Sequence, residues 1–175
     1  MAGIIKVNQY QDFNGNTLFT SDGNGNLTTQ KTLYPAFAVT KSGNQDLTDQ
    51  TTTKVTWETE IFDTDNAFGD NKFTVPTGKD GKYQFNSALM IDALANSQLE
   101  YGFIYIYKNG SLEFETVSDF RDSDTRRFHM TLGLLLDLSA GDYIEVYTNI
   151  SDNSGNPRIN ASDSEAHFSG YRIGS

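Results

Sequence analysis

The chain has 175 residues, no cysteine and a formal net charge of −10 at pH 7, so disulfides and thiolate metal sites are excluded. The acidic balance argues against nucleic acid as a partner, because affinity for phosphates rests on lysine and arginine. The longest apolar run, residues 132–136, is far shorter than the ~20 residues of a membrane-spanning helix, so membrane insertion is not expected.

Residues 1–34 are polar and glycine-rich, and they contain two turn signals ten residues apart, at 14–16 and 24–26. Short β segments are expected around these turns, at 4–7, 17–20 and 27–30. Two lysines and two aspartates cancel in this stretch, so the rest of the chain carries the whole charge of −10. Because large apolar residues are too few to form a core here, we predict an attachment arm that orders only against a partner or against copies of itself.

From residue 35 onward, apolar and polar residues alternate with period two, which predicts strands nearly throughout. Glycine, proline and asparagine clusters between the alternating segments mark tight turns. Many strands with tight turns indicate an antiparallel β-sandwich or barrel. The eight main strands are expected at 36–40, 54–62, 82–92, 99–107, 111–118, 127–138, 142–150 and 165–173, with a short extra strand at 73–75.

The strand expected at 99–107 is apolar on both faces. Leu99 and four aromatic residues share one face, and isoleucines occupy the other. Because a sandwich strand that faces water should be polar on one side, an aromatic second face favours a subunit interface. The alternative is that the tyrosines lie on the surface with their hydroxyls in water. The candidate interface residues are Tyr101, Phe103, Tyr105 and Tyr107.

Eight short segments occur in a fixed order between residues 36 and 171. They are AFAV at 36–39, KVTW at 54–57, FTVP at 73–76, GKYQF at 81–85, KNG at 108–110, LDL at 136–138, GDYI at 141–144 and FSGY at 168–171. In this order and spacing they resemble the C1q-like domain of the C1q and tumour-necrosis-factor jelly-roll group. The resemblance implies an all-β antiparallel jelly-roll sandwich over residues 35–175, and it implies a homotrimer.

The two ends of the chain carry a second resemblance. Residues 4–8 with the turn at 14–16, and the ending at 170–174, are similar to small structural proteins of tailed bacteriophages, marine ones especially. No collagen-like Gly-X-Y stalk is present, so a complement-type or hormone-type function is not expected. The resemblance implies a virion protein on the phage particle surface: a tail-associated or fibre-tip trimer whose residues 1–34 bind other virion proteins. A capsid decoration or cement trimer is the alternative. A glycan depolymerase and a secreted lectin come lower, the lectin because no secretion signal is apparent.

Loops of the sandwich are expected to gather alternately at its two ends, because successive antiparallel strands run in opposite directions. Loops 41–53, 93–98, 119–126 and 151–164 then lie at the end opposite the arm. Long polar loops on a rigid scaffold are where binding usually occurs, and these could contact a host-surface glycan or protein; the alternative is that they are only solvated. The candidate receptor-facing residues are Asp119, Phe120, Arg121, Asp122, Asp124, Arg126, Arg127, Asp152, Asn153, Asn156 and Arg158.

No catalytic residue, cofactor or metal is assigned, and the chain is not expected to be an enzyme. The segment 63–66 begins like a calcium loop, but Phe68 and Thr74 stand where glycine and glutamate are needed. Glycoside hydrolysis needs two carboxylates about 5–10 Å apart across a cleft, which Glu113 and Glu115 do not provide by sequence proximity alone. His129 and His167 are expected to be structural.

Overall fold

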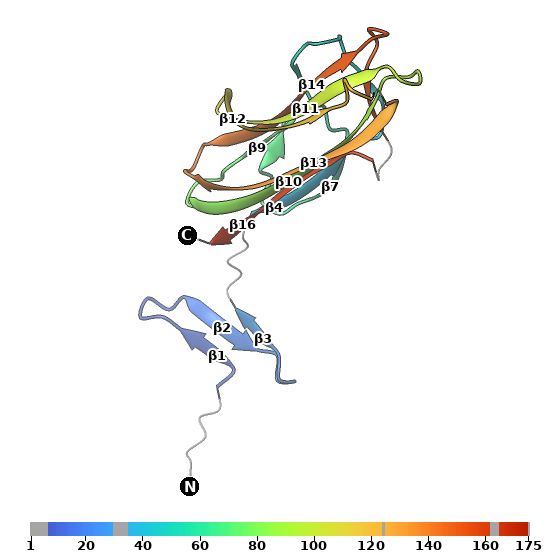
Figure 1. Ribbon diagram of the computed structural model, residues 1–175. Coiled ribbons are helices and arrows are strands. Elements are labelled where there is room, and N and C mark those ends of the chain that lie inside the picture. Colours follow the sequence, from blue (N-terminus) through green and yellow to red (C-terminus); the bar gives the residue numbers. More distant parts are fainter. Residues whose placement is uncertain (1–6, 30–34, 124, 162–164, 175) are drawn as a thin grey trace. The chain divides into compact units, whose positions relative to one another are not determined.

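The structure is a computed structural model that describes residues 7–29, 35–123, 125–161 and 165–174 (Figure 1). The chain divides into two compact units, residues 1–33 and 34–175, and each is described by itself. All elements in the described ranges are β-strands, and their pairings are antiparallel. Within the same ranges, no helical segment has the length and apolar character that crossing a membrane requires.

The first unit is a three-stranded meander with two similar turns. In the first turn, Asp12 Oδ1 accepts the backbone N–H groups of Asn14 and Asn16 at 2.9 and 2.8 Å. Asp22 repeats this arrangement ten residues later, at 2.7 and 3.2 Å. These side chains replace backbone partners and close each turn. The strands are β1 (Gln9–Gln11), β2 (Thr17–Ser21) and β3 (Leu27–Thr29).

The strand expected at 4–7 is not observed where it can be checked. Residues 4–6 lie outside the described residues, and Val7 is not in a strand. The first strand is instead β1, where the Tyr10 ring stacks on that of Phe19 in β2, with ring centroids 4.7 Å apart. This aromatic pair explains the register, because cross-strand pairs are the main stabilising unit of a small sheet.

The second unit contains two packed sheets (Figure 1). The first sheet has the order β13-β10-β16-β4-β7, and β15 and β5 continue it beside the end of β10. The second sheet has the order β12-β11-β14-β9-β8, and β6 also pairs with β14. The bounds are β4 (Ala36–Thr40), β5 (Gln45–Asp46), β6 (Thr53–Lys54), β7 (Thr59–Asp63), β8 (Phe68–Gly69), β9 (Lys72–Thr74), β10 (Gly81–Asp92), β11 (Leu99–Lys108), β12 (Ser111–Asp119), β13 (Arg127–Leu138), β14 (Tyr143–Asp152), β15 (Arg158–Asn160) and β16 (His167–Gly174).

The core between the sheets is built by the alternation seen in the sequence. Tyr83 and Phe85 of β10 are fully buried and face Ile104 and Ile106, which are fully buried in β11. Each such side chain contributes about 1.5–3 kcal/mol on burial. At Gly170 of β16 a Cβ atom would lie only 2.6 Å from the Phe85 ring, so glycine is needed where the strand crosses the aromatic cluster.

The strand expected at 54–62 is broken, and its middle passes from one sheet to the other. β6 pairs with β14 of the second sheet, whereas β7 pairs with β4 of the first sheet. The buried Lys41 side chain holds this crossover, because its Nζ donates to Thr56 O at 2.7 Å and to Glu58 Oε1 at 3.0 Å. Val55 and Trp57 face the core from the crossing segment, so they reproduce the alternation of a strand without forming one.

Candidate functional site

Four polar loops meet at one end of the second unit, here called the distal end, opposite the end at which β4 begins. Thr40 at the end of β4 pairs with His167 at the start of β16. Neighbouring strands run in opposite directions in the same way along both sheets, so one strand ends where its neighbour begins. Backbone hydrogen bonds join the loops directly: Asn153 donates to Gln98 O at 2.9 Å, and Leu99 donates to Thr125 O at 2.8 Å. The structure therefore brings together the loops that contain the candidate receptor-facing residues.

Asp92, at the distal end of β10, accepts hydrogen bonds from several of the segments that meet here. Its side chain is 1% exposed, and it accepts hydrogen bonds from Arg127 Nε at 2.7 Å, Asn160 Nδ2 at 3.2 Å and the backbone N–H of Leu94 at 2.8 Å. Arg126 Nε lies 3.4 Å away. Burial by itself would raise the pKa of Asp92, but the hydrogen bonds, that from Arg127 foremost, outweigh it and hold this pKa below its ordinary value.

Arg158 in the short strand β15 continues a row of alternating charge. It pairs across strands with Asp92 on one side and with Asp46 of β5 on the other. Its guanidinium lies 3.1 Å from Asp46 Oδ1, while its Nε is buried without a hydrogen-bond partner among the described residues. The side chain of Arg158 is 27% exposed and that of Asp46 is 80% exposed. The Arg158 cation is therefore largely covered by the protein, whereas the Asp46 carboxylate projects into solvent.

A cavity of about 330 Å³ opens beside this row. Loop residues form its walls: the backbone N–H of Leu47 donates to Pro157 O at 2.9 Å, and Ser154 Oγ donates to Asp152 Oδ2 at 2.8 Å. Leu94 has a φ of 64°, a left-handed conformation that is uncommon for a leucine. The lining residues are Asp46, Leu47, Leu94, Ser154, Asn156, Pro157 and Arg158.

Two of the candidate receptor-facing residues are not free at the surface, which corrects their assignment. Asp152 is 3% exposed, and it accepts the N–H and the hydroxyl of Ser154, so it forms the turn. Phe120 packs against the ring of Phe128 at 4.7 Å and against the core. Their sequence positions in loops did not reveal this, because turn formation and core contact depend on the tertiary partners.

The remaining candidates lie on or beside the loops. Asp119 is paired with Arg121, whose hydrogen bonds lower the pKa of Asp119 to about 2. The guanidinium of Arg121 also lies 5.8 Å from the ring of Tyr101. Asp122 and Asn153 are exposed, and Asp124 lies outside the described residues. Arg121 and Asp119 therefore connect the distal loops to the aromatic strand β11.

The aromatic residues of β11 form a continuous row on the outer face of the second sheet. Ring centroids are 5.7 Å apart for Tyr101 and Phe103, 5.3 Å for Phe103 and Tyr105, and 6.3 Å for Tyr105 and Tyr107. These side chains are half-buried against one another. Leu99 does not share their face, contrary to expectation: a register shift between residues 99 and 101 turns it into the core, where it is fully buried.

The outer face of the first sheet is uncharged over its central rows. A row here is a set of residues paired side by side across neighbouring strands. The first row crosses five strands, and the second row includes two exposed apolar side chains, Leu135 at 63% and Tyr171 at 50%. Beside this face, the edge strands β12 and β13 expose Phe114 at 50% and Phe128 at 38%. The two rows are Gly133, Asn86, Ser169, Ala38 and Phe62, and Leu135, Gln84, Tyr171 and Ala36.

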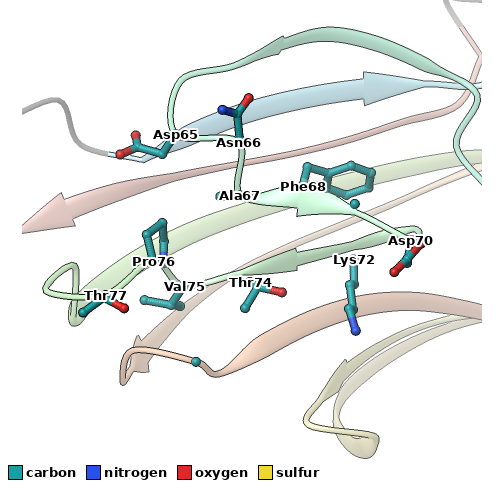
Figure 2. A pocket seen from close by; sticks show the side chains of 12 residues that line it. Asp65, Asn66, Ala67, Phe68, Asp70, Lys72, Thr74, Val75, Pro76 and Thr77 are labelled. Atoms are coloured by element: carbon teal, nitrogen blue, oxygen red, sulfur yellow. The ribbon is translucent and has the colours of Figure 1, made fainter.

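A second cavity, of about 480 Å³, lies at the opposite end, beside the segment that begins like a calcium loop. Figure 2 shows Asp65 and Asp70 at opposite ends of the view, with Lys72 near Asp70. Asp63 is used in turn formation, since its Oδ2 accepts the N–H of Phe68 at 2.7 Å. No group of three or more metal-ligating side chains occurs within the described ranges.

The two histidines make local contacts near the distal end of the first sheet. His129 Nε2 lies 3.1 Å from Glu165 O. His167 pairs with Thr40 in the β4–β16 ladder. Burial lowers the pKa of His167, and the neighbouring charge of His129 lowers it further. These contacts are those of structural side chains.

Comparison with known proteins identifies the fold. No family model and no curated protein sequence matches the chain. The crystal structure of murine APRIL matches with a TM-score of 0.56 and 11% identity, covering 80% of this chain and 99% of that one. The globular domain of the zebrafish complement 1qA protein matches with a TM-score of 0.55 and 18% identity, covering 80% and 98%. These likenesses confirm the predicted fold class, a C1q/TNF-like jelly-roll β-sandwich.

Proposed function

We propose that the chain is a non-enzymatic, homotrimeric structural protein of a tailed bacteriophage, tail-associated or at a fibre tip, with its distal loops facing the host. Residues 1–34 bind other virion proteins in this account. The C1q/TNF-like jelly roll is compatible with such a role, and the resemblance of both chain ends to phage structural proteins motivates it. The observation that carries the assembly part is the uncharged outer face of the first sheet.

That face is unusual for a chain with a net charge of −10. Like charges disfavour association, so copies of an acidic protein meet at low cost only where charge is sparse. Outside these two rows, the edge strands β12 and β13 each expose an apolar ring, Phe114 and Phe128. A contact between one of these exposed rings and the uncharged face of a second copy is heterologous, and a heterologous contact that closes on itself produces a ring. Three copies are the number that the family resemblance implies.

The aromatic row of β11 is the other candidate contact surface. Burial raises the pKa of Tyr105, and the charge of Glu115 raises it further, so this row is already partly removed from water within one copy. Glu115 and Asp119 flank the row on β12, which places acidic side chains at any contact made there. We therefore favour the first sheet for the contact and retain the aromatic row as the alternative.

A capsid decoration trimer is the second candidate function, because it needs the same arm and the same assembly. A glycan depolymerase is a lower candidate. Its general acid would need a raised pKa, whereas the resolved shifts of Asp92, Asp119 and Asp142 are all downward. Incubation with host envelope polysaccharide, followed by an assay for new reducing ends, separates the enzyme from the binding protein.

Electron microscopy of phage particles labelled with an antibody to residues 35–175 tests the virion role. We expect label at the tail or the fibre tip. Label over the capsid surface supports the decoration role instead, and particles without any label contradict both.

A further inference from the structure

The distal cavity combines the features of a ligand site. It is concave, with apolar walls from Leu47, Leu94 and Pro157 and polar groups from Asn156 and Arg158. This mixture is characteristic of small-ligand pockets, in which apolar walls supply contact and a few polar groups fix orientation. Four of the five arginines of the chain lie at this end, and only Arg172 lies elsewhere.

Arg158 is the group in this cavity whose interactions are least complete. Among the described residues, its only ion-pair partner is an aspartate that is 80% exposed, and its Nε is buried without a hydrogen-bond partner there. A surface ion pair of this kind contributes little to stability. A buried donor without a partner is unfavourable, so a shift of the Arg158 side chain toward an anion in the cavity breaks no hydrogen bond at Nε.

Leu94 provides an independent observation at the same place. Its φ of 64° is an uncommon conformation for a leucine. The backbone N–H of Leu94 is held by Asp92 Oδ1 at 2.8 Å, which maintains this conformation. The side chain is 38% exposed and lines the cavity. Residues held in such conformations are concentrated at binding sites, where the surrounding structure fixes them.

We propose that this cavity binds a sugar residue that carries an anionic group, as part of a host-surface glycan. The Arg158 guanidinium receives the anion in place of Asp46, and the apolar walls contact the C–H face of the sugar ring. Asn156 and Ser154 are within the lining to contact hydroxyls. The identification of the source as a host glycan rests on the proposed function, whereas the chemistry of the cavity does not.

Binding of purified full-length protein to small sugars at low ionic strength tests this directly, by ligand-observed NMR titration. The probes are a glucuronate disaccharide, glucose 6-phosphate and, as the neutral control, a glucose disaccharide. We expect the carboxylate or the phosphate probe to bind and the neutral probe to bind much more weakly. The two anionic probes distinguish a uronic-acid glycan from a phosphorylated one.

Substitutions around the cavity should change the affinity for the anionic probe in opposite directions. Arg158→Gln should weaken binding of the anionic probe by about tenfold or more, since hydrogen bonds to charged groups are strong. Asp46→Asn should tighten it several-fold, because the competing carboxylate is removed while the exposed position leaves folding unaffected. Leu94→Gly should weaken binding without lowering the melting temperature, since glycine adopts a positive φ readily. Arg172→Gln, at the opposite end of the unit, is the matched control and should leave binding of every probe unchanged.

Equal binding of the neutral probe, or weaker anion binding by the Asp46→Asn variant, overturns the anionic assignment. Absence of binding by both the wild-type chain and the Asp46→Asn variant overturns the site. These results are separable from the virion role. If the protein binds the sugar but the antibody labels no phage particles, the proposed function is contradicted and the cavity assignment stands. If the antibody labels the particles but no sugar binds, the virion role is supported and the cavity assignment is overturned.

Discussion

Arg127 Nε lies 2.7 Å from Asp92 Oδ2, and this pair joins the distal ends of β13 and β10. Both strands belong to the first sheet, so the pair connects the uncharged face to the loops that carry the candidate binding residues. Because Asp92 also accepts the N–H of Leu94, one buried carboxylate fixes both the end of the sheet and one wall of the distal cavity.

Asp92→Asn should destabilise the fold by about 2 kcal/mol, because it removes the charge that half-exposed Arg126 and Arg127 face. The pKa of Asp92 in the folded protein is below its ordinary value of 3.8. Its ionised form therefore stabilises the fold fully above pH 3.8, and this contribution is lost as the pH falls through the lower folded-state pKa. Thermal melts between pH 7 and pH 2 should show this acid dependence in wild type and less of it in the variant. Asp46→Asn, in an exposed pair, is the control and should change stability little.

Removal of residues 1–34 should leave the jelly roll folded. The buried hydrophobic residues of the described core lie between Phe37 and Phe168, so the truncation removes none of them. We expect the melting temperature of residues 35–175 to stay within a few degrees of that of the full chain, as measured by circular dichroism. Unfolding of the truncated chain would show that the arm is required within the sandwich.

Leu135→Asp should disrupt the trimer, because it places a charge on the exposed apolar part of the first sheet, where a contact would desolvate it. Tyr105→Asp tests the alternative surface on β11. If the first sheet forms the contact, sedimentation should show smaller species for the Leu135 variant and the wild-type species for the Tyr105 variant. The reverse result would assign the contact to the aromatic row, as the sequence first indicated.

The combined substitution of Asp122, Arg126 and Asn156 by alanine should leave the trimer stable and reduce adsorption of phage to host cells. All three positions lie on exposed parts of the distal loops or beside them, and Arg127 remains as the closer partner of Asp92. Competition between purified variant trimer and infecting phage measures the effect, with Thr77→Ala at the opposite end as the control. Unchanged adsorption would favour the capsid decoration role.

The sequence allowed prediction of the long strands of the sandwich and of the end at which the loops gather, because both follow from period-two alternation and strand parity. It did not reveal the crossover at Val55 and Trp57, since core-facing residues alternate there as they do in a strand. The shift that buries Leu99 depends on its partners in β14. The distal cavity rests on β5 and β15, which are two and three residues long. Strands this short carry no periodicity, so the sequence indicated Arg158 only as a loop residue and did not place it opposite Asp46 and Asp92.

The mass of the full chain in solution tests the central claim, that this protein acts as an assembled trimer. Analytical ultracentrifugation at micromolar concentration should show a single species with three times the 19.5 kDa mass of one chain. A stable species of 19.5 kDa at the same concentration would contradict the account.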